Sequence, residues 1–141
     1  MQYGPTVEIR NMTRGSSSRV PFKKIAQEIL PERYQLSLVL CGDTLSRRIN
    51  RTYRQPRQTN KKNYVPNVLS FPLDKYEGEI FLNVRKAERE AKTLGISARK
   101  RIAHLFVHGC LHLKGLKHGT KMDASEKRIL KKFRYKMVNR K

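Results

Sequence analysis

The amino-acid sequence predicts an α+β protein in which helices cover a sheet. Segments that alternate with the period of two typical of strands occur only in the first 84 residues, and the remainder has helical spacing. The strands come as two early segments separated by a helix, and then as one hairpin. This order excludes a doubly wound fold. The length of 141 residues and the lack of an internal repeat predict a single domain over residues 1–141.

Four segments are predicted to be strands. Thr6–Asn11 alternates weakly and is expected at an edge of the sheet, whereas Tyr34–Cys41 places three leucines on one side. Asn67–Phe71 and Gly78–Val84 are two further strands, and a turn at Asp74–Glu77 joins them into a hairpin.

Five segments are predicted to be helices, each with a start or stop signal. They are Pro21–Leu30, Asp43 to about Tyr53, Arg85–Leu94, a long helix from Ser97 to Gly115, and a last helix that begins at a capping box, Asp123–Glu126. In the second helix, Leu45 and Ile49 are expected to point inward. The last helix is expected to bury Ile129, Leu130, Phe133 and Met137. The segment Gln55–Asn63 is polar and basic, and a loop is expected there.

The formal charge is +21, from 32 basic and 11 acidic residues. Such a chain repels itself unless a polyanion matches its charge, so nucleic acid is the first expected partner and an anionic membrane surface the second. The two cysteines form no C-x-x-C pair, which indicates a reducing compartment. No signal sequence and no membrane span are evident, so a cytoplasmic location is expected.

Three of the four histidines fall in one window, and their spacing predicts a metal site. His108 and His112 lie one turn apart on a helix, and Gly115 can end that helix so that His118 returns to the same face. Three imidazoles that leave a fourth position open are typical of a catalytic zinc, so one Zn²⁺ per chain is expected. The alternative is a helix with surface or core histidines and no metal. His104 is one turn further up and is expected to support the site or to pack.

The spacing H-x3-H-x5-H also occurs in the metzincin peptidases, which carry a glutamate directly after the first histidine as general base. Gly109 occupies that place here. A metal-dependent peptidase is therefore disfavoured.

Four motifs lie between about Tyr34 and the last helix: residues 108–118 (HGCLHLKGLKH), 67–72 (NVLSFP), 78–80 (GEI) and 49–54 (INRTYR). Taken together, they resemble the YbeY family of bacterial endoribonucleases, which mature ribosomal RNA. The resemblance implies a mixed four-stranded sheet with helices, and zinc bound by the three histidines. It also implies an arginine essential for RNA cleavage, at the position of Arg54, and ribosomal RNA and ribosomal particles as partners.

The chain departs from the family pattern at three places. Lys117 stands where the family usually has aspartate, which removes a carboxylate beside the third ligand. Placing the essential arginine at Arg54 requires about six inserted residues within Gln55–Asn63, and Arg57 is the fallback. The family's Gly-Asp-Ile is Gly78-Glu79-Ile80 here.

Basic side chains on two faces are expected to hold the RNA backbone. They are Arg47, Arg51, Arg57, Lys61, Lys62, Lys114, Lys117, Lys131 and Arg134. The function that follows is zinc-dependent endoribonuclease activity on single-stranded RNA, in maturation of the 3′ end of the small-subunit ribosomal RNA and in ribosome quality control. Either water or the RNA 2′-hydroxyl can be the nucleophile. The alternative is a non-catalytic RNA- or ribosome-binding protein with a structural zinc.

Overall fold

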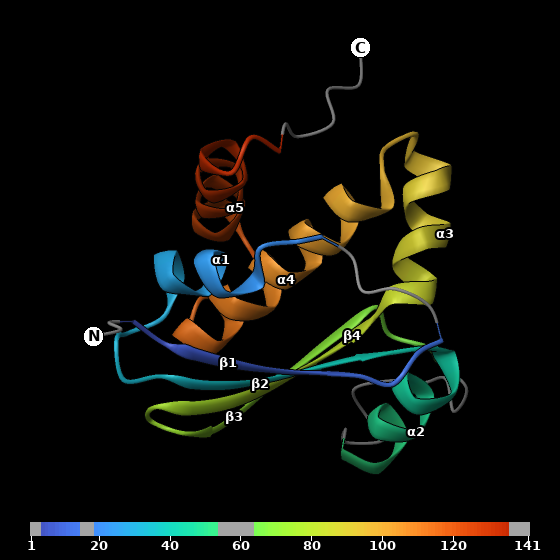
Figure 1. Ribbon diagram of the computed structural model, residues 1–141, viewed down its shortest axis with the longest axis horizontal. Helices are drawn as coiled ribbons and strands as arrows, with labels where there is room; N and C mark the ends of the chain where they lie inside the picture. Colours follow the sequence, from blue (N-terminus) through green and yellow to red (C-terminus); the bar gives the residue numbers. More distant parts are fainter. Residues whose placement is uncertain (1–3, 15–18, 54–63, 136–141) are drawn as a thin grey trace.

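The computed structural model of the chain describes residues 4–14, 19–53 and 64–135. Within these ranges it contains one four-stranded sheet and five helices (Figure 1). The strands are β1 (Thr6–Asn11), β2 (Gln35–Cys41), β3 (Val68–Asp74) and β4 (Glu77–Asn83). The helices are α1 (Phe22–Ile29), α2 (Asp43–Tyr53), α3 (Val84–Leu94), α4 (Ala98–Lys114) and α5 (Thr120–Lys132). The predicted α+β class is confirmed.

The strands lie in the order β1-β2-β4-β3, with β1 at one edge as expected. β2 pairs in parallel with both β1 and β4, whereas β3 and β4 form the predicted antiparallel hairpin, so the sheet is mixed. Residues paired across neighbouring strands point to the same face. Leu38 and Leu40 pair with Ile80 and Leu82, and these side chains form the buried face of the sheet.

Helix α4 crosses this buried face, and α1, α3 and α5 lie around it on the same side of the sheet (Figure 1). Its central residues are buried on nearly every side, because it has the sheet below it and helices beside it. The Phe106 ring meets the Phe22 ring of α1 edge to face, with ring centroids 4.9 Å apart. Burying a side chain of this size contributes about 1.5–3 kcal/mol to folding.

Helix α2 lies on the opposite face of the sheet (Figure 1). Leu45 and Ile49, which were predicted to point inward, are half-buried, and the fully buried residues of α2 are Ser46 and Asn50. The Ser46 hydroxyl donates a hydrogen bond of 2.7 Å to the carbonyl of Pro66. The inner face of α2 thus meets polar backbone as well as the sheet, and backbone carbonyls need donors where water is excluded.

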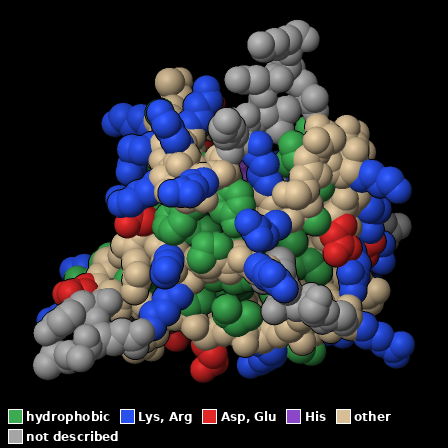
Figure 2. Space-filling model, turned by 45° about the horizontal axis from the view of Figure 1, so that its top comes forward, with side chains coloured by type: hydrophobic (Ala, Val, Ile, Leu, Met, Phe, Trp, Pro, Cys, Tyr) green, Lys and Arg blue, Asp and Glu red, His purple; other side chains and the backbone are tan. Residues whose placement is uncertain are grey.

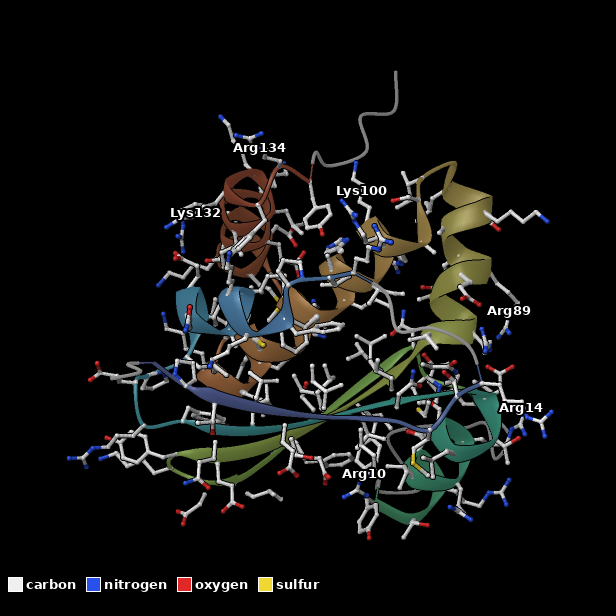
Figure 3. The ribbon with its side chains drawn as sticks, viewed as in Figure 1. Arg10, Arg14, Arg89, Lys100, Lys132 and Arg134 are labelled. Carbon is white, nitrogen blue, oxygen red and sulfur yellow. The ribbon has the colours of Figure 1, made fainter. Side chains whose placement is uncertain are left out.

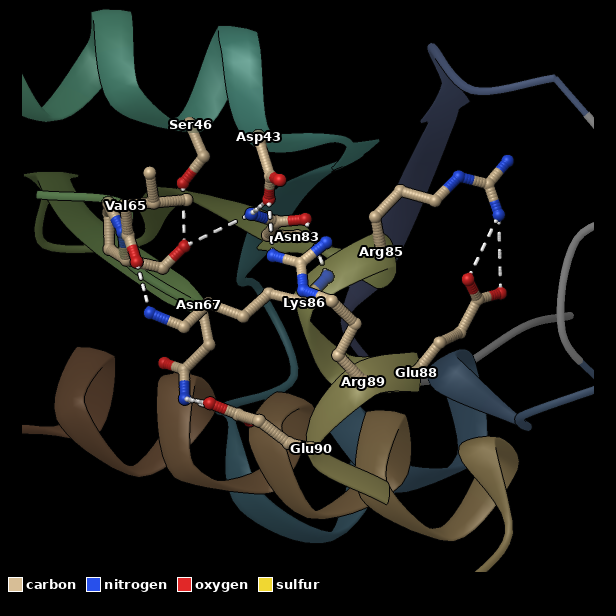
Figure 4. A network of polar contacts seen from close by, with 11 residues as sticks. Asp43, Ser46, Val65, Asn67, Asn83, Arg85, Lys86, Glu88, Arg89 and Glu90 are labelled. Atoms are coloured by element: carbon tan, nitrogen blue, oxygen red, sulfur yellow. Dashed lines mark hydrogen bonds and ion pairs between the residues drawn. The ribbon is translucent and has the colours of Figure 1, made fainter. Parts of the chain in front are cut away.

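A polar network joins the residues before β3 to α2 and α3 (Figure 4). The Asn83 amide donates to Asp43 at 2.8 Å, and Arg89 pairs with the same carboxylate at 2.9 Å. The Lys86 ammonium donates to the carbonyl of Val65, and the Asn67 amide lies 3.2 Å from a carboxylate oxygen of Glu90. The network therefore anchors the chain where it leaves residues 54–63.

Candidate metal centre

Local sequence signals set the length of α4 and the turn that follows it. The Ser97 hydroxyl accepts a hydrogen bond from the Lys100 backbone N–H at the start of the helix. Gly115 ends the helix in a left-handed conformation with φ of 107°, which strains any residue that has a Cβ. The N–H of Leu116 then bonds to the carbonyl of Leu111 at 3.0 Å, the pattern of a Schellman cap. The chain reverses here and brings His118 back toward the helix.

The three histidine rings form one cluster, as the spacing predicted. The ring centroid of His108 lies 4.5 Å from that of His112 and 4.8 Å from that of His118, and the other two centroids are 4.6 Å apart. The potential ligand atoms all lie within 4.8 Å of one another, so the group can hold a metal ion. The two helical histidines are half-buried, whereas His118 is exposed.

Hydrogen bonds orient the two helical imidazoles. His108 Nδ1 lies 2.6 Å from a carboxylate oxygen of Glu126, and His112 Nδ1 lies 3.1 Å from the carbonyl oxygen of Leu116. Both partners are acceptors, so each Nδ1 carries the proton and each Nε2 presents its lone pair. Burial first, and then the neighbouring His108 and His118, lower the pKa of His112, which favours its neutral, ligating form.

The distance between the two Nε2 atoms suits a metal ion. They lie 3.0 Å apart. Two nitrogen ligands of a tetrahedral zinc, each about 2.0–2.1 Å from the ion, are roughly 3.3–3.4 Å apart. A cation between the nitrogens would satisfy both lone pairs with a shift of a few tenths of an ångström, so the donor set fits a metal such as zinc.

Glu126 is the residue of this site that sequence reasoning missed. It belongs to α5, is only 6% exposed, and accepts from His104 at 2.8 Å as well as from His108. Burial raises the pKa of this carboxyl, but the hydrogen bonds from the two histidines outweigh burial and lower the pKa to about 2. Glu126 is therefore an ionised acceptor that orients His108, in the way a carboxylate supports a metal-bound imidazole.

The predicted capping box at Asp123–Glu126 is wrong. Helix α5 begins one turn earlier, with Gly119 at its N-cap and no side-chain cap, and Asp123 lies in its first turn. Glu126 shares the buried face of α5 with Met122 and Ile129. A carboxylate at such spacing on an apolar face needs a charged or hydrogen-bonding partner, and this signal was available in the sequence.

His104 lies outside the ligand cluster but is bonded to the same carboxylate. Its other ring nitrogen lies 3.5 Å from the guanidinium of Arg101, which pairs with Glu90 at 2.9 Å. Glu90 in turn contacts the Asn67 amide at 3.2 Å (Figure 4). A row of polar contacts thus extends from Glu126 to the start of β3.

Gly109 follows the first histidine and faces the sheet rather than the cluster. A Cβ at this position would lie 3.0 Å from the Ser70 hydroxyl and 3.1 Å from Ile80. The Ser70 hydroxyl already donates to the Gly109 carbonyl at 3.0 Å. A glutamate has no room here, so the general base of the metzincins has no counterpart at position 109.

The structure places the predicted RNA-binding residues in three regions. Arg54, Arg57, Lys61 and Lys62 lie outside the described residues. Arg47 and Arg51 belong to α2, on the face of the sheet opposite α4, and Arg47 is half-buried with its Nε shielded from solvent. Lys114 and Lys117 are exposed at the end of α4, next to the histidines, and Lys131 and Arg134 are exposed at the end of α5 (Figure 3 labels Arg134).

On the face of the molecule shown in Figure 2, the charged side chains are mostly lysine and arginine. No helix in the described ranges is long and apolar enough to cross a membrane.

Comparison with known proteins agrees with the motifs. A family model described as endoribonuclease YbeY matches residues 8–139. A Helicobacter pylori protein named endoribonuclease YbeY is 36% identical over 126 residues, which cover 86% of this chain and 83% of the relative. An Anaplasma phagocytophilum protein of the same name is 35% identical over 111 residues, which cover 74% of this chain and 68% of the relative. The solution structure of a Thermotoga maritima protein shares the fold, with a TM-score of 0.64, 21% identity and 92% of each chain covered. The chain belongs to the endoribonuclease YbeY family.

Proposed function

We propose that this chain is a zinc-dependent endoribonuclease that cleaves single-stranded RNA. Its proposed role is cytoplasmic, in the maturation of the 3′ end of small-subunit ribosomal RNA and in ribosome quality control. The observation that carries the proposal is the convergence of two tautomerically fixed imidazoles and His118 in a member of this family. The family model and the relatives are named for endoribonuclease activity, and the histidine cluster supplies chemistry suited to it.

Zinc is the ion that this donor set favours. The ligands are three neutral nitrogens, whereas magnesium and calcium prefer oxygen. When bound, such an ion supplies Lewis acidity toward a phosphoryl oxygen and toward water. His108 and His112 would hold it through Nε2, with Glu126 and the Leu116 carbonyl keeping the two rings in place.

The charges around the cluster suit a phosphate substrate. Lys114, Lys117 and Lys121 are exposed on the end of α4, the following turn and the start of α5. These ammonium groups attract an anionic RNA backbone and repel a metal cation. The repulsion costs about 1 kcal/mol for each pair of unit charges at ~4 Å in water. Among the described residues, Glu126 is the carboxylate hydrogen-bonded to this cluster, and it offsets part of that repulsion.

Arg54 is proposed to stabilise the charge that develops on the phosphate, through two parallel N–H donors. The motif at residues 49–54 (INRTYR) supports this, because the resemblance places the essential arginine at Arg54. The ring of Tyr53, which precedes it, lies 5.8 Å from that of Phe71 in β3. The preceding residue of β3, Ser70, donates to the Gly109 carbonyl beside His108. The end of α2 and the histidine helix therefore contact the same edge strand from its two faces.

Metal analysis and cleavage assays together test the proposal. The purified protein is expected to contain about one zinc per chain, and His112→Ala should lose it. Ribosomal RNA should be cleaved, cleavage should stop with a chelator and return with zinc, and a peptide substrate should remain intact. Zinc without RNA cleavage would point to the non-catalytic RNA-binding alternative. Full metal content in His112→Ala would overturn the site.

A further inference from the structure

Two adjoining hollows lie where α2, α3 and α4 begin, with volumes of about 470 and 280 Å³. Thr13 and Arg85 line both hollows, so the two hollows lie side by side. Five arginines from five different segments line it, and we call them the arginine surface: Arg14, Arg19, Arg48, Arg85 and Arg99. Figure 3 shows Arg14 at this end of the molecule, beside α2.

Four of the five guanidiniums of the arginine surface have no carboxylate partner among the described residues. All eleven Asp and Glu residues of the chain lie within the described ranges, and only Asp43 and Glu88 line the hollows. Asp43 is paired with Arg89 at 2.9 Å, and Glu88 with Arg85 at 3.0 Å. In the described part of the chain, no carboxylate lies within 4.0 Å of the guanidinium of the other four arginines.

The backbone adds to this potential. The first residues of α2, α3 and α4 line the walls of the hollows, and the N-terminus of a helix carries a partial positive charge. The exposed guanidiniums are planar forks that match phosphate oxygens in pairs. Several guanidiniums spread around two adjoining hollows fit a chain of phosphates better than one small anion.

The arginine surface lies away from the histidine cluster. Arg99 precedes His108 by nine residues of α4, which is about 13 Å along the axis and about 2.5 turns. The two side chains therefore leave the helix on opposite sides. A short strand bound at the histidines would have to pass around α4 to reach Arg99, whereas a folded RNA can contact both sides of the helix.

We propose that the arginine surface is a second RNA-binding site, which holds the phosphate backbone of a folded part of the substrate away from the scissile strand. It rests on the proposed RNA substrate but not on catalysis. The site gives the chain a preference for structured RNA over short oligonucleotides, because each additional phosphate contact releases counterions.

The test compares two triple variants that remove equal charge. The first, Arg14→Gln/Arg48→Gln/Arg99→Gln, removes three exposed members of the arginine surface. The control, Lys24→Gln/Arg33→Gln/Lys75→Gln, removes three exposed cations elsewhere: on α1, just before β2 and in the turn between β3 and β4. Binding to an RNA hairpin with single-stranded flanks is measured between roughly 50 and 200 mM salt.

The plot of log K against log salt has a negative slope. The first variant should make this slope less steep by about 2 to 3, which is 0.7–0.9 for each lost contact. The control should change the slope by much less, and replacing the same three arginines by lysine should keep it. Equal slopes in the two triple variants would overturn the proposal. If the triple variant does not fold, Arg14→Gln and Arg99→Gln alone should each lower the slope by about 0.7–0.9.

Two further measurements separate RNA binding at the arginine surface from catalysis and from membrane binding. If the unsubstituted protein binds the hairpin but cleaves neither it nor a five-nucleotide RNA, the proposed function fails while the slope comparison still stands. Vesicles containing phosphatidylserine should not distinguish the two triple variants. Loss of vesicle binding in the first variant, with an unchanged RNA slope, would assign the arginine surface to a membrane and overturn the proposal.

Discussion

Replacing Glu126 by glutamine should weaken metal binding without unfolding the protein. The carboxylate lies 2.6 Å from His108 Nδ1 and 2.8 Å from His104 Nε2, with 6% of the residue exposed. Glutamine has the same shape but offers one accepting oxygen, and its NH₂ group can only donate. One of the two histidines therefore loses its acceptor, and the imidazole of His108 loses an ionised partner.

The magnitude follows from two independent considerations. Loss of such a supporting partner typically lowers metal affinity 10- to 100-fold, which is about 1.4–2.7 kcal/mol. A hydrogen bond to a charged group contributes about 1.5–3 kcal/mol, against about 0.5–1.5 kcal/mol between neutral groups. The difference of roughly 1–1.5 kcal/mol agrees with the lower end of the first range. We expect a decrease in zinc affinity of about tenfold or slightly more.

Competition against a chromophoric chelator measures the zinc affinity directly. Glu28→Gln is the matched control, because it removes an equal charge from an ion pair with Lys132 on the surface, 2.8 Å long and partly exposed. This control should bind zinc as the parent does. Unchanged affinity in Glu126→Gln, or an equal decrease in both variants, would refute the idea that this carboxylate orients His108. Thermal unfolding of the metal-free proteins checks that Glu126→Gln is folded.

Arg54→Ala should reduce RNA cleavage by two to three orders of magnitude, with nearly unchanged zinc content and RNA affinity. Arg57→Ala should affect only salt-sensitive RNA binding. The reverse pattern would move the essential arginine to position 57. Gly78→Ala should destabilise the fold by about 1–3 kcal/mol in urea unfolding, because a Cβ there would lie 2.3 Å from the buried Tyr34 hydroxyl. An unchanged free energy of unfolding would mean that the Tyr34 ring can move aside at no cost. The hydrogen bond from Arg89 lowers the pKa of Asp43 in the folded protein. The ionised Asp43 therefore stabilises the fold fully above the pKa of the unfolded chain, about 3.9, and this stabilisation is lost as the pH falls through the lower pKa of the folded protein. Asp43→Asn should therefore lose less stability than the parent below about pH 4, and parallel stability curves would contradict this.

Local patterns were sufficient for most of the elements. The periods of two and 3.6, the serine before α4 and the glycine after it act within a few residues, so the element types and most boundaries followed from the sequence alone. The same locality explains why the histidine cluster was predicted: His108 and His112 are one turn apart, and Gly115 reverses the chain toward His118. Zinc as the ion and Arg54 as the catalytic arginine remain predictions.

Contacts between segments far apart in the sequence could be seen only in the tertiary structure. The order β1-β2-β4-β3 places β4 between β2 and β3, and periodicity contains no information about which strands pair. Glu126 reaches His108 only because α5 packs against α4 at a particular angle and depth. The capping-box pattern around Glu126 is a local signal, and the packing of α5 against α4 outweighed it. The ionised Glu126 carboxylate is more strongly stabilised by hydrogen bonds from two histidines than it would be at a helix end exposed to water.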